Sequence, residues 1–193
     1  GEKTAKIAVS QKAGSENPAP GEEIVGSLST ADDLNIQFAH DAVEPVKKTL
    51  TFTLEKTATA ETKVKLVFDE RHVDEYNFDH ATEYVVFPEK LCTIANDGVI
   101  TIPAGETSAQ IEVTLSPSAS DLEYVTTYMV PLQAVAQTEG IVVKDEAEYV
   151  DFLVSRIGSK KIRNICYFEV NDCNPLNAIE YILEDGQPFF DAV

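Results

Sequence analysis

Apolar and polar residues alternate along short stretches of this chain, and turn-forming residues separate those stretches. The clearest case runs from Lys47 to Lys56, where Leu50, Phe52 and Leu54 fall on one face and threonines on the other. A period of two is typical of a strand with one buried face. Similar stretches lie at residues 4–10, 24–28, 34–40, 62–70, 81–90, 99–102, 111–115, 128–137 and 148–157.

Many short strands separated by turns predict a mainly β fold, in which two antiparallel sheets pack their apolar faces together as a β-sandwich. A closed barrel is the alternative. Pro88 must end its stretch or place it at a sheet edge, because proline has no N–H to donate. No stretch before residue 170 has a convincing helical pattern, so we expect no helix there.

The last 36 residues have a different pattern. Residues 158–161 (GSKK) are typical of a linker, and Ile162–Val170 is almost continuously apolar, like a strand covered on both faces. Asn174 can cap a helix that Gly186 would end, and 189–193 begins another strand. Strand, helix and strand with short connections form the βαβ unit of a parallel sheet.

A βαβ unit cannot close a core by itself, because its strands leave open edges. Either it docks on the sandwich or on a partner, or the rest of a parallel-sheet domain lies outside this sequence, and we expect the second. The predicted organisation is a sandwich at 1–157, a linker at 158–161 and a βαβ segment at 162–193.

The net charge limits the partners. With 33 acidic and 15 basic residues the formal charge is −18, which repels nucleic acid. Neutral ligands such as sugars remain open, as do cations, and the acidity also keeps a protein in solution. No apolar run approaches the ~20 residues of a transmembrane helix. No glycine-rich phosphate loop is present, and we expect no cofactor.

No catalytic residue can be assigned from the pattern. The sequence has no G-x-S-x-G frame, and Cys92 has no neighbouring base that would mark a nucleophile. Its three cysteines form no disulfide framework, and we expect free, partly buried thiols. A glycosidase needs two carboxylates at a defined separation, and nothing here singles out a pair. Ligand-binding residues are unassigned as well.

The densest polar segment is FDERHVDEYNFDH at 68–80, which also holds His72 and His80. Its carboxylates suit calcium, but neither the EF-hand spacing nor a His-x-x-x-His pair is present. We therefore expect no metal and a solvated acidic connection between strands. The candidates, should a metal bind, are Asp69, Glu70, Asp74, Glu75 and Asp79.

Exposed aromatic rings are the usual platforms for sugars. The sequence has no tryptophan, which makes a strong carbohydrate site less favourable, and the alternation predicts that several of its aromatic rings belong to the core. His40, near a strand end, is expected to be structural. The aromatic candidates are Tyr76, Phe78, Tyr84, Phe87, Tyr124 and Tyr128.

A Tyr and a Pro end one strand, an I-x-x-G turn follows, and a later strand reads Y-x-x-P-L. These three motifs resemble those of an N-terminal domain widespread in surface lipoproteins of Bacteroidetes. The resemblance covers residues 4–157 and implies an immunoglobulin-like sandwich placed between a lipid anchor and a glycan-handling module. It carries no catalytic residue. The matching positions are Tyr84 with Pro88, Ile102 with Gly105, and Tyr128 with Pro131 and Leu132.

The closing stretch, with CYFEVNDCNPLNA and PFFD, is similar to the opening of the (β/α)8 barrel in family 18 endo-β-N-acetylglucosaminidases. The catalytic signature of that family, D-x-x-D-x-D-x-E, lies at its fourth strand and does not occur in this sequence. The resemblance implies a parent protein that acts on or binds N-glycans.

The two resemblances together imply a non-catalytic accessory domain of a cell-surface or periplasmic lipoprotein, which positions a downstream barrel module. Its expected partners are that module and an N-glycan or other carbohydrate. The alternative is an N-terminal fragment of a family 18 hydrolase that lacks the catalytic residues.

Overall fold

The computed structural model describes residues 22–158. The chain divides into two compact units, Gly1–Ile157 and Gly158–Val193, and the described residues belong almost entirely to the first. The predicted strand at 4–10, linker residues 159–161 and the predicted βαβ segment at 162–193 lie outside the described residues.

Short strands are the main secondary structure of residues 22–158, with one α-helix and three 3-10 turns. The strands are β1 (Ile24–Thr30), β2 (Asn35–Ala39), β3 (Val46–Leu54), β4 (Thr62–Phe68), β5 (Val85–Val86), β6 (Cys92–Ile94), β7 (Val99–Ile102), β8 (Ser108–Leu115), β9 (Thr127–Ala136), β10 (Ile141–Val143) and β11 (Tyr149–Ile157). The helical elements are α1 (Arg71–His80), η1 (Glu89–Leu91), η2 (Ala95–Gly98) and η3 (Asp145–Ala147).

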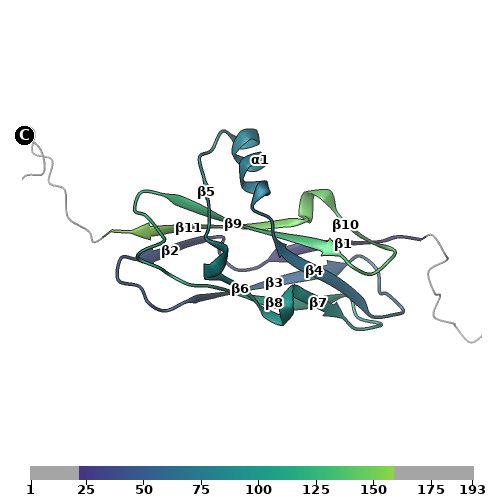
Figure 1. Ribbon diagram of the computed structural model, residues 1–193. Helices are drawn as coiled ribbons and strands as arrows, with labels where there is room; N and C mark the ends of the chain where they lie inside the picture. Colours follow the sequence, from purple (N-terminus) through teal and green to yellow (C-terminus); the bar gives the residue numbers. More distant parts are fainter. Residues whose placement is uncertain (1–21, 159–193) are drawn as a thin grey trace, which may run out of the picture. The chain divides into compact units, whose positions relative to one another are not determined.

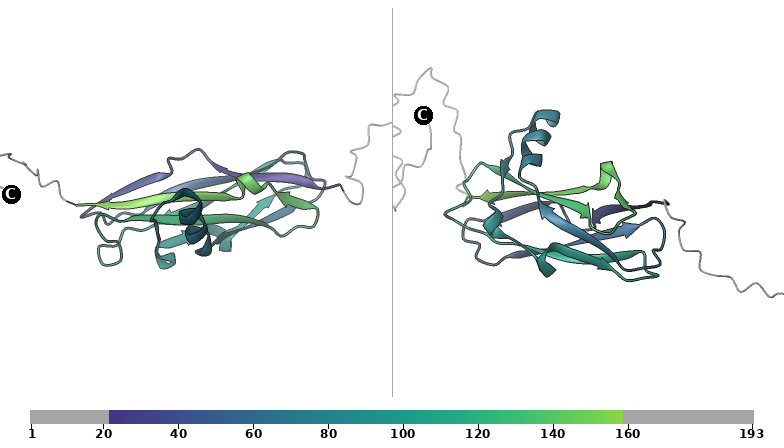
Figure 2. Two further views of the ribbon diagram at one scale, coloured as in Figure 1. Left: turned by 90° about the horizontal axis from the view of Figure 1, so that it is seen from above. Right: turned by 45° about the vertical axis from the view of Figure 1, so that its right-hand side comes forward.

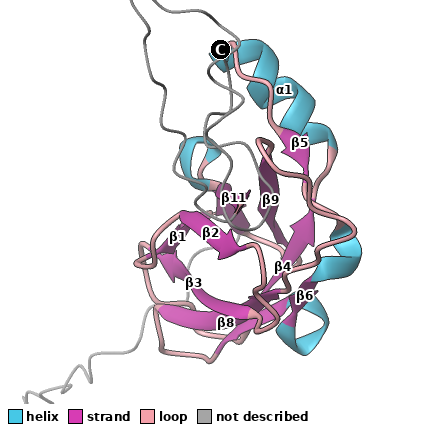
Figure 3. Cartoon of the chain, turned by 90° about the vertical axis from the view of Figure 1, so that its left-hand side faces the viewer, coloured by secondary structure: helices cyan, strands magenta, loops and turns pink. Residues whose placement is uncertain are grey.

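The strands form two sheets that pack as a sandwich, with strand orders β10-β1-β3-β8-β6 and β2-β11-β9-β4-β7. The short β5 pairs with β9 as an extra strand of the second sheet. Figure 3 separates β3 and β8 on one side from β9 and β11 on the other. This architecture confirms the mainly β, sandwich-like prediction, and the two separate sheets exclude the closed barrel among the described residues.

The expectation of antiparallel sheets was wrong in part, because both sheets are mixed. β1 runs parallel to β10, and β2 and β5 run parallel to β11 and β9 respectively. Parallel neighbours need long connections, so the two strands of each pair lie far apart in the sequence. Even β5 and β9, the pair with the shortest connection, are separated by the segment that holds β6, β7 and β8. Alternation within a strand carries no information about which distant strand it will join.

Residues at every second position fill the space between the sheets, as the alternation predicts. On β3, Leu50, Phe52 and Leu54 are at most 2% exposed, while the threonines between them face outward. Phe87 and Phe152 are also fully buried in this core. The apolar face of each sheet is therefore covered by the other, which is the main source of stability in a sandwich.

Gly26 lets β1 approach one of the large side chains of the core closely. A Cβ atom at this position would overlap the ring atoms Cε1 and Cζ of Phe52 on the neighbouring strand. The glycine has an ordinary strand conformation, so only the space taken by the Phe52 ring requires it.

The helix α1 corrects the expectation that no helix precedes residue 170. It follows β4 and stands on the outer face of the sheet that carries β9 and β11 (Figures 1 and 2). It ends at Ala81, which adopts the left-handed conformation at φ 51°. Only Val73 gives its inner face an aliphatic buried residue, so the usual apolar stripe is missing.

None of the helices at 22–158 has the length and hydropathy of a membrane span.

Pro131 sits inside β9 at the point where β4 has already ended. The last residue of β4, Phe68, pairs with Leu132, and the next N–H of the chain, that of Asp69, donates to the Pro131 carbonyl at 2.9 Å. The missing N–H of Pro131 therefore falls beyond the ladder, where the chain turns away to begin α1. On the same strand, the Tyr128 hydroxyl accepts a hydrogen bond from the Glu123 N–H.

We expect Gly26→Ala to lower the free energy of unfolding by about 1–3 kcal/mol, because the new methyl group forces the Phe52 ring out of its position. Urea denaturation followed by circular dichroism measures the change. Ser29→Ala on the same strand is exposed and serves as the control, with a change within about 0.5 kcal/mol. Equal stability of Gly26→Ala and the native protein would mean that the core accommodates the methyl group.

Candidate functional site

A cluster of polar and aromatic side chains joins α1 to β11. His72 Nε2 of the helix lies 3.0 Å from Asp151 Oδ2 of the strand. The His72 ring also stacks on Tyr149, with 3.6 Å between ring centroids and 6° between the planes. The Tyr149 hydroxyl in turn donates a 2.8 Å hydrogen bond to Asp69, just before the helix. Two side chains of one segment, Asp69 and His72, and two of a strand far along the sequence thus form one network.

Backbone geometry brings these residues together. In β11 the even-numbered residues, such as Phe152, face the core, so Tyr149 and Asp151 point out of the sandwich. In α1, Tyr76 lies three positions after Val73 and four after His72, so the three share the face turned to the sheet.

Asn77 fixes the segment that follows the helix. Its side-chain oxygen accepts from the Tyr84 N–H and the Thr82 hydroxyl, and its amide donates to the Tyr84 carbonyl. The Tyr76 ring stacks on His80 at 3.9 Å and lies 5.9 Å from the Tyr84 ring. α1 is therefore held both at the sheet and at its C-terminal end.

Burial changes the acidity of this cluster. Desolvation raises the pKa of the Asp151 carboxyl above its usual range, and the neighbouring His72 partly opposes the shift. Desolvation also raises the pKa of Tyr149, together with the Asp69 carboxylate that accepts its hydroxyl hydrogen. Asp151 Oδ1 is buried and accepts no hydrogen bond within the described part of the chain.

The contacts favour attachment of the helix over nucleophilic catalysis. A histidine and carboxylate pair activates a nucleophile only when a hydroxyl or thiol lies against the histidine. Between residues 22 and 158 no serine, threonine or cysteine is hydrogen-bonded to His72, and the Tyr149 hydroxyl is already bonded to Asp69. Cys92 is also a poor candidate for a nucleophile, because burial raises the pKa of its thiol to about 12 and so disfavours the reactive thiolate.

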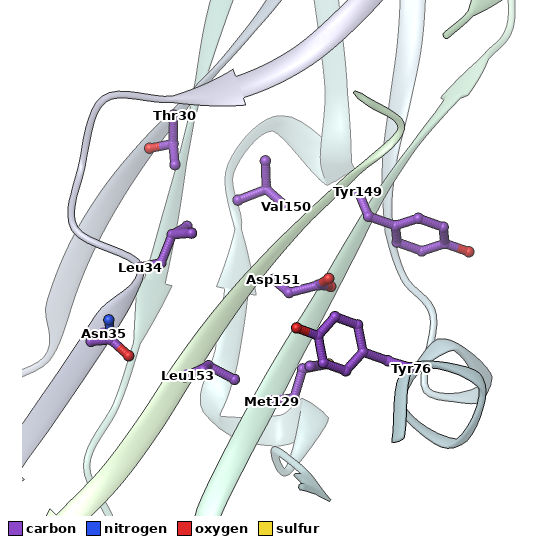
Figure 4. A pocket seen from close by; sticks show the side chains of 9 residues that line it. All are labelled: Thr30, Leu34, Asn35, Tyr76, Met129, Tyr149, Val150, Asp151 and Leu153. Carbon is purple, nitrogen blue, oxygen red and sulfur yellow. The ribbon is translucent and has the colours of Figure 1, made fainter. Parts of the chain in front are cut away.

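A pocket of about 400 Å³ lies beside this cluster (Figure 4). Its apolar lining comes from Leu34, Met129, Val150 and Leu153. Its polar lining comes from Thr30, Asn35, Tyr76, Tyr149 and Asp151. In Figure 4 the Tyr76 ring reaches from α1 with its hydroxyl toward β11, whereas Leu34 and Asn35 lie on the other side of that strand. The helix thus forms one wall of the pocket, and the turn between β1 and β2 forms the other.

The five carboxylates predicted as metal candidates do not converge. Asp69 faces inward to Tyr149, while Glu70, Asp74, Glu75 and Asp79 are exposed around α1. Within residues 22–158 no group of three or more His, Cys, Asp or Glu side chains is placed to hold a metal ion. The expected acidic connection between strands is in fact this helix.

The aromatic candidates have different environments. Phe87 and Tyr128 belong to the core, where their rings meet edge to face, as expected for several of the set. Phe78 and Tyr124 are 88% and 47% exposed. Tyr76 lines the pocket. His40 is exposed, and its carbonyl accepts a hydrogen bond from Arg156.

Sequence patterns did not identify Asp151 or Asn35 as site residues. Each is an outward-facing polar residue on a strand, a position that is normally solvated. One signal was present: Asp151 is the single charged residue in the apolar run YVDFLV. A charge in such a run indicates either an exposed face or a partner from elsewhere, and the partner here is His72.

We predict that His72→Ala lowers the free energy of unfolding at pH 7 by about 2 kcal/mol, because the buried Asp151 carboxylate loses its hydrogen-bond donor. Asp151→Asn added to His72→Ala should recover part of the loss, since an amide is less costly to bury than a carboxylate. Urea unfolding of the single and double variants measures both changes.

His40→Ala is the matched control for that experiment. His40 is 46% exposed and lies 4.0 Å from the exposed Asp41, so its removal should change the stability by no more than about 0.5 kcal/mol. Equal losses in His40→Ala and His72→Ala would contradict a structural role for the contact with Asp151.

The raised pKa of Asp151 also predicts a pH dependence. Because the folded-state pKa lies above the unfolded value of about 3.9, the folded protein binds more protons at intermediate pH. The stability that this group contributes is complete below about pH 4 and is lost as the pH rises through the folded pKa. Asp151→Asn should therefore gain stability relative to the native protein as the pH rises. Unfolding curves at a series of pH values measure the difference, and a constant difference or the opposite trend would contradict it.

Comparisons with known proteins agree with the fold. The crystal structure of EndoBT-3987 from Bacteroides thetaiotamicron with a Man5GlcNAc product matches 85% of this chain, with 28% sequence identity and a TM-score of 0.59. A putative carbohydrate-binding protein from Bacteroides ovatus matches 67% at 19% identity and a TM-score of 0.54. A two-domain protein of unknown function from Bacteroides fragilis matches 70% at 14% identity and a TM-score of 0.58.

The matches cover only part of those proteins. This chain spans 40%, 36% and 46% of the three structures, so it corresponds to less than half of each. The second and third likenesses establish the fold alone. No curated protein matches the sequence. A protein-family model described as "-like, N-terminal domain" matches residues 23–141, more than half of the chain, and the chain belongs to this family of N-terminal domains.

Proposed function

We propose that this chain is the non-catalytic accessory domain at the N-terminal side of a glycan-processing or glycan-binding protein, and that it positions a glycosidase-like module. The observation that carries the proposal is the likeness to EndoBT-3987, a protein crystallised with a Man5GlcNAc product. The likeness extends over 85% of this chain but 40% of that protein. A domain of this kind fits the N-terminal part of a multidomain protein.

The C-terminal end of the sandwich suits a positioning role. Arg156 lies at the end of β11 and donates hydrogen bonds to the carbonyls of Ala119, Leu122 and His40. Its guanidinium also lies 4.4 Å from the centroid of the Tyr124 ring. These contacts tie the last strand to two neighbouring loops, so the chain leaves the sandwich from a fixed point.

The finer parts of the proposal rest on the sequence resemblances. Residues 162–193 begin a family 18-like barrel, and the parent protein is a lipoprotein of the cell surface or the periplasm. An N-glycan is its partner. The alternative is that the chain is a piece of a family 18 endo-β-N-acetylglucosaminidase and acts only together with the rest of that enzyme, which the likeness to EndoBT-3987 also favours.

The chain by itself should not release glycans from a high-mannose glycoprotein. Its sequence lacks the D-x-x-D-x-D-x-E signature, and the lining of the pocket contains a single carboxylate, that of Asp151, where a glycosidase needs two. Mass spectrometry of the glycans released after incubation with the purified chain measures the activity. Turnover would contradict the accessory role.

A longer protein provides the matched control. The gene should continue after Val193 with the family 18 signature within about 150 residues, the distance to the fourth strand of such a barrel. The protein extended through that barrel should release glycans in the same assay. A downstream sequence without a glycosidase-like or glycan-binding module would contradict the proposal.

A further inference from the structure

The pocket between α1 and the β1–β2 turn has polar groups that the fold itself does not use. Within residues 22–158 neither the Asn35 side-chain amide nor the Tyr76 hydroxyl makes a hydrogen bond to the protein, and both line the pocket. Asp151 Oδ1 is an acceptor without a donor in the same wall. These groups together supply both donors and acceptors, which is what hydroxyl groups require of a binding site.

The rest of the lining is apolar. Leu34 is 43% exposed and Leu153 is partly buried, so these two side chains offer an apolar surface beside Asn35, whereas Met129 is 1% exposed and lies at the base of the pocket (Figure 4). A small apolar surface bordered by unpaired polar groups suits a ligand that has one C–H face and a rim of hydroxyls. A pyranose ring has this distribution, and a purely apolar ligand would leave the polar groups of the wall without partners.

The charges at the pocket favour a neutral ligand over an ionic one. No lysine, arginine or histidine lines the pocket, and the chain carries a net charge of −18, so a phosphate or carboxylate would be repelled. The one carboxylate, Asp151, already has His72 at 3.0 Å as its partner, which lowers its attraction for a cation. The volume of about 400 Å³ lies near the lower end of the range for small-molecule pockets, which favours one ring over a long chain.

We propose that this pocket binds a single neutral hexopyranose unit, held by the Tyr76 hydroxyl and the Asn35 amide over the apolar surface of Leu34 and Leu153. The inference rests on the proposed accessory function, to which it adds a direct contact between the domain and a glycan. The two aromatic rings that line the pocket, Tyr76 and Tyr149, are each already stacked on a histidine, so we expect the affinity for one ring to be in the millimolar range.

Titration of the isotope-labelled 193-residue chain with methyl glycosides tests the proposal by NMR. The neutral probes are the methyl glycosides of mannose, N-acetylglucosamine, galactose and glucose, and methyl glucuronide is the anionic comparison. At least one neutral glycoside should give saturable shifts at the amides of Asn35, Tyr76 and Leu153. Methyl glucuronide should bind more weakly than methyl glucoside. The absence of shifts with all four neutral probes, or equal binding of the glucuronide, would overturn the proposal.

Tyr76→Phe keeps the stacked ring and removes only the hydroxyl, and Asn35→Ala removes the amide. Each should weaken the binding about threefold to tenfold, the effect of one lost hydrogen bond. Tyr124→Phe is the matched control, because Tyr124 is 47% exposed and lies outside the pocket, and it should bind as the native chain does. Unchanged binding in both pocket variants would place the sugar elsewhere.

A failure of the proposed sugar site can be told apart from a failure of the proposed accessory function. Release of glycans by the chain alone would overturn the accessory role, whatever the titration shows. A chain that neither releases glycans nor binds any neutral glycoside would retain the accessory role and lose the sugar site.

Discussion

The contact between His72 and Asp151 is the interaction on which the outer surface of the second sheet depends. At 3.0 Å it joins the helix between β4 and β5 to the last strand, and the stacked Tyr149 ring extends the same joint to Asp69. A helix with one buried aliphatic residue, Val73, gains little from the hydrophobic effect. Polar contacts of defined geometry hold it in place, and the position of Tyr76 follows from them.

The packed sandwich holds the β11 residues of these contacts, Tyr149 and Asp151, in fixed positions. Its core contains three fully buried phenylalanines, and β1 approaches Phe52 so closely that only glycine fits at position 26. Pro131 ends the ladder between β4 and β9 at the point where α1 begins, so the chain can turn away from the sheet without leaving a donor unpaired. The position of α1 therefore depends on where β4 ends, and the end of β4 is fixed by its pairing with β9 in the packed sandwich.

Alternation of apolar residues predicted most of the strands correctly because each inward position is buried by the opposite sheet. The stretch 99–102 corresponds to β7 residue for residue, and 62–70 was too long only because the chain turns at Asp69. The same signal missed α1, since its inner face has one aliphatic residue, Val73, beside the polar and aromatic side chains of His72 and Tyr76. It also missed the parallel pairs β1–β10 and β2–β11, because pairing between distant strands leaves no trace in a local period.

The sequence by itself determined the fold class, the inward residues of each strand and the acidic charge, because each depends on composition or on neighbours one to four positions away. The tertiary structure alone decided the site. Asn35, Tyr76 and Asp151 come from three separate segments, and of these only Tyr76 was a candidate from the sequence, as one of six aromatic residues. They meet because β11 pairs with both β2 and β9 and because α1 docks over that junction, a set of long-range contacts that no local pattern encodes.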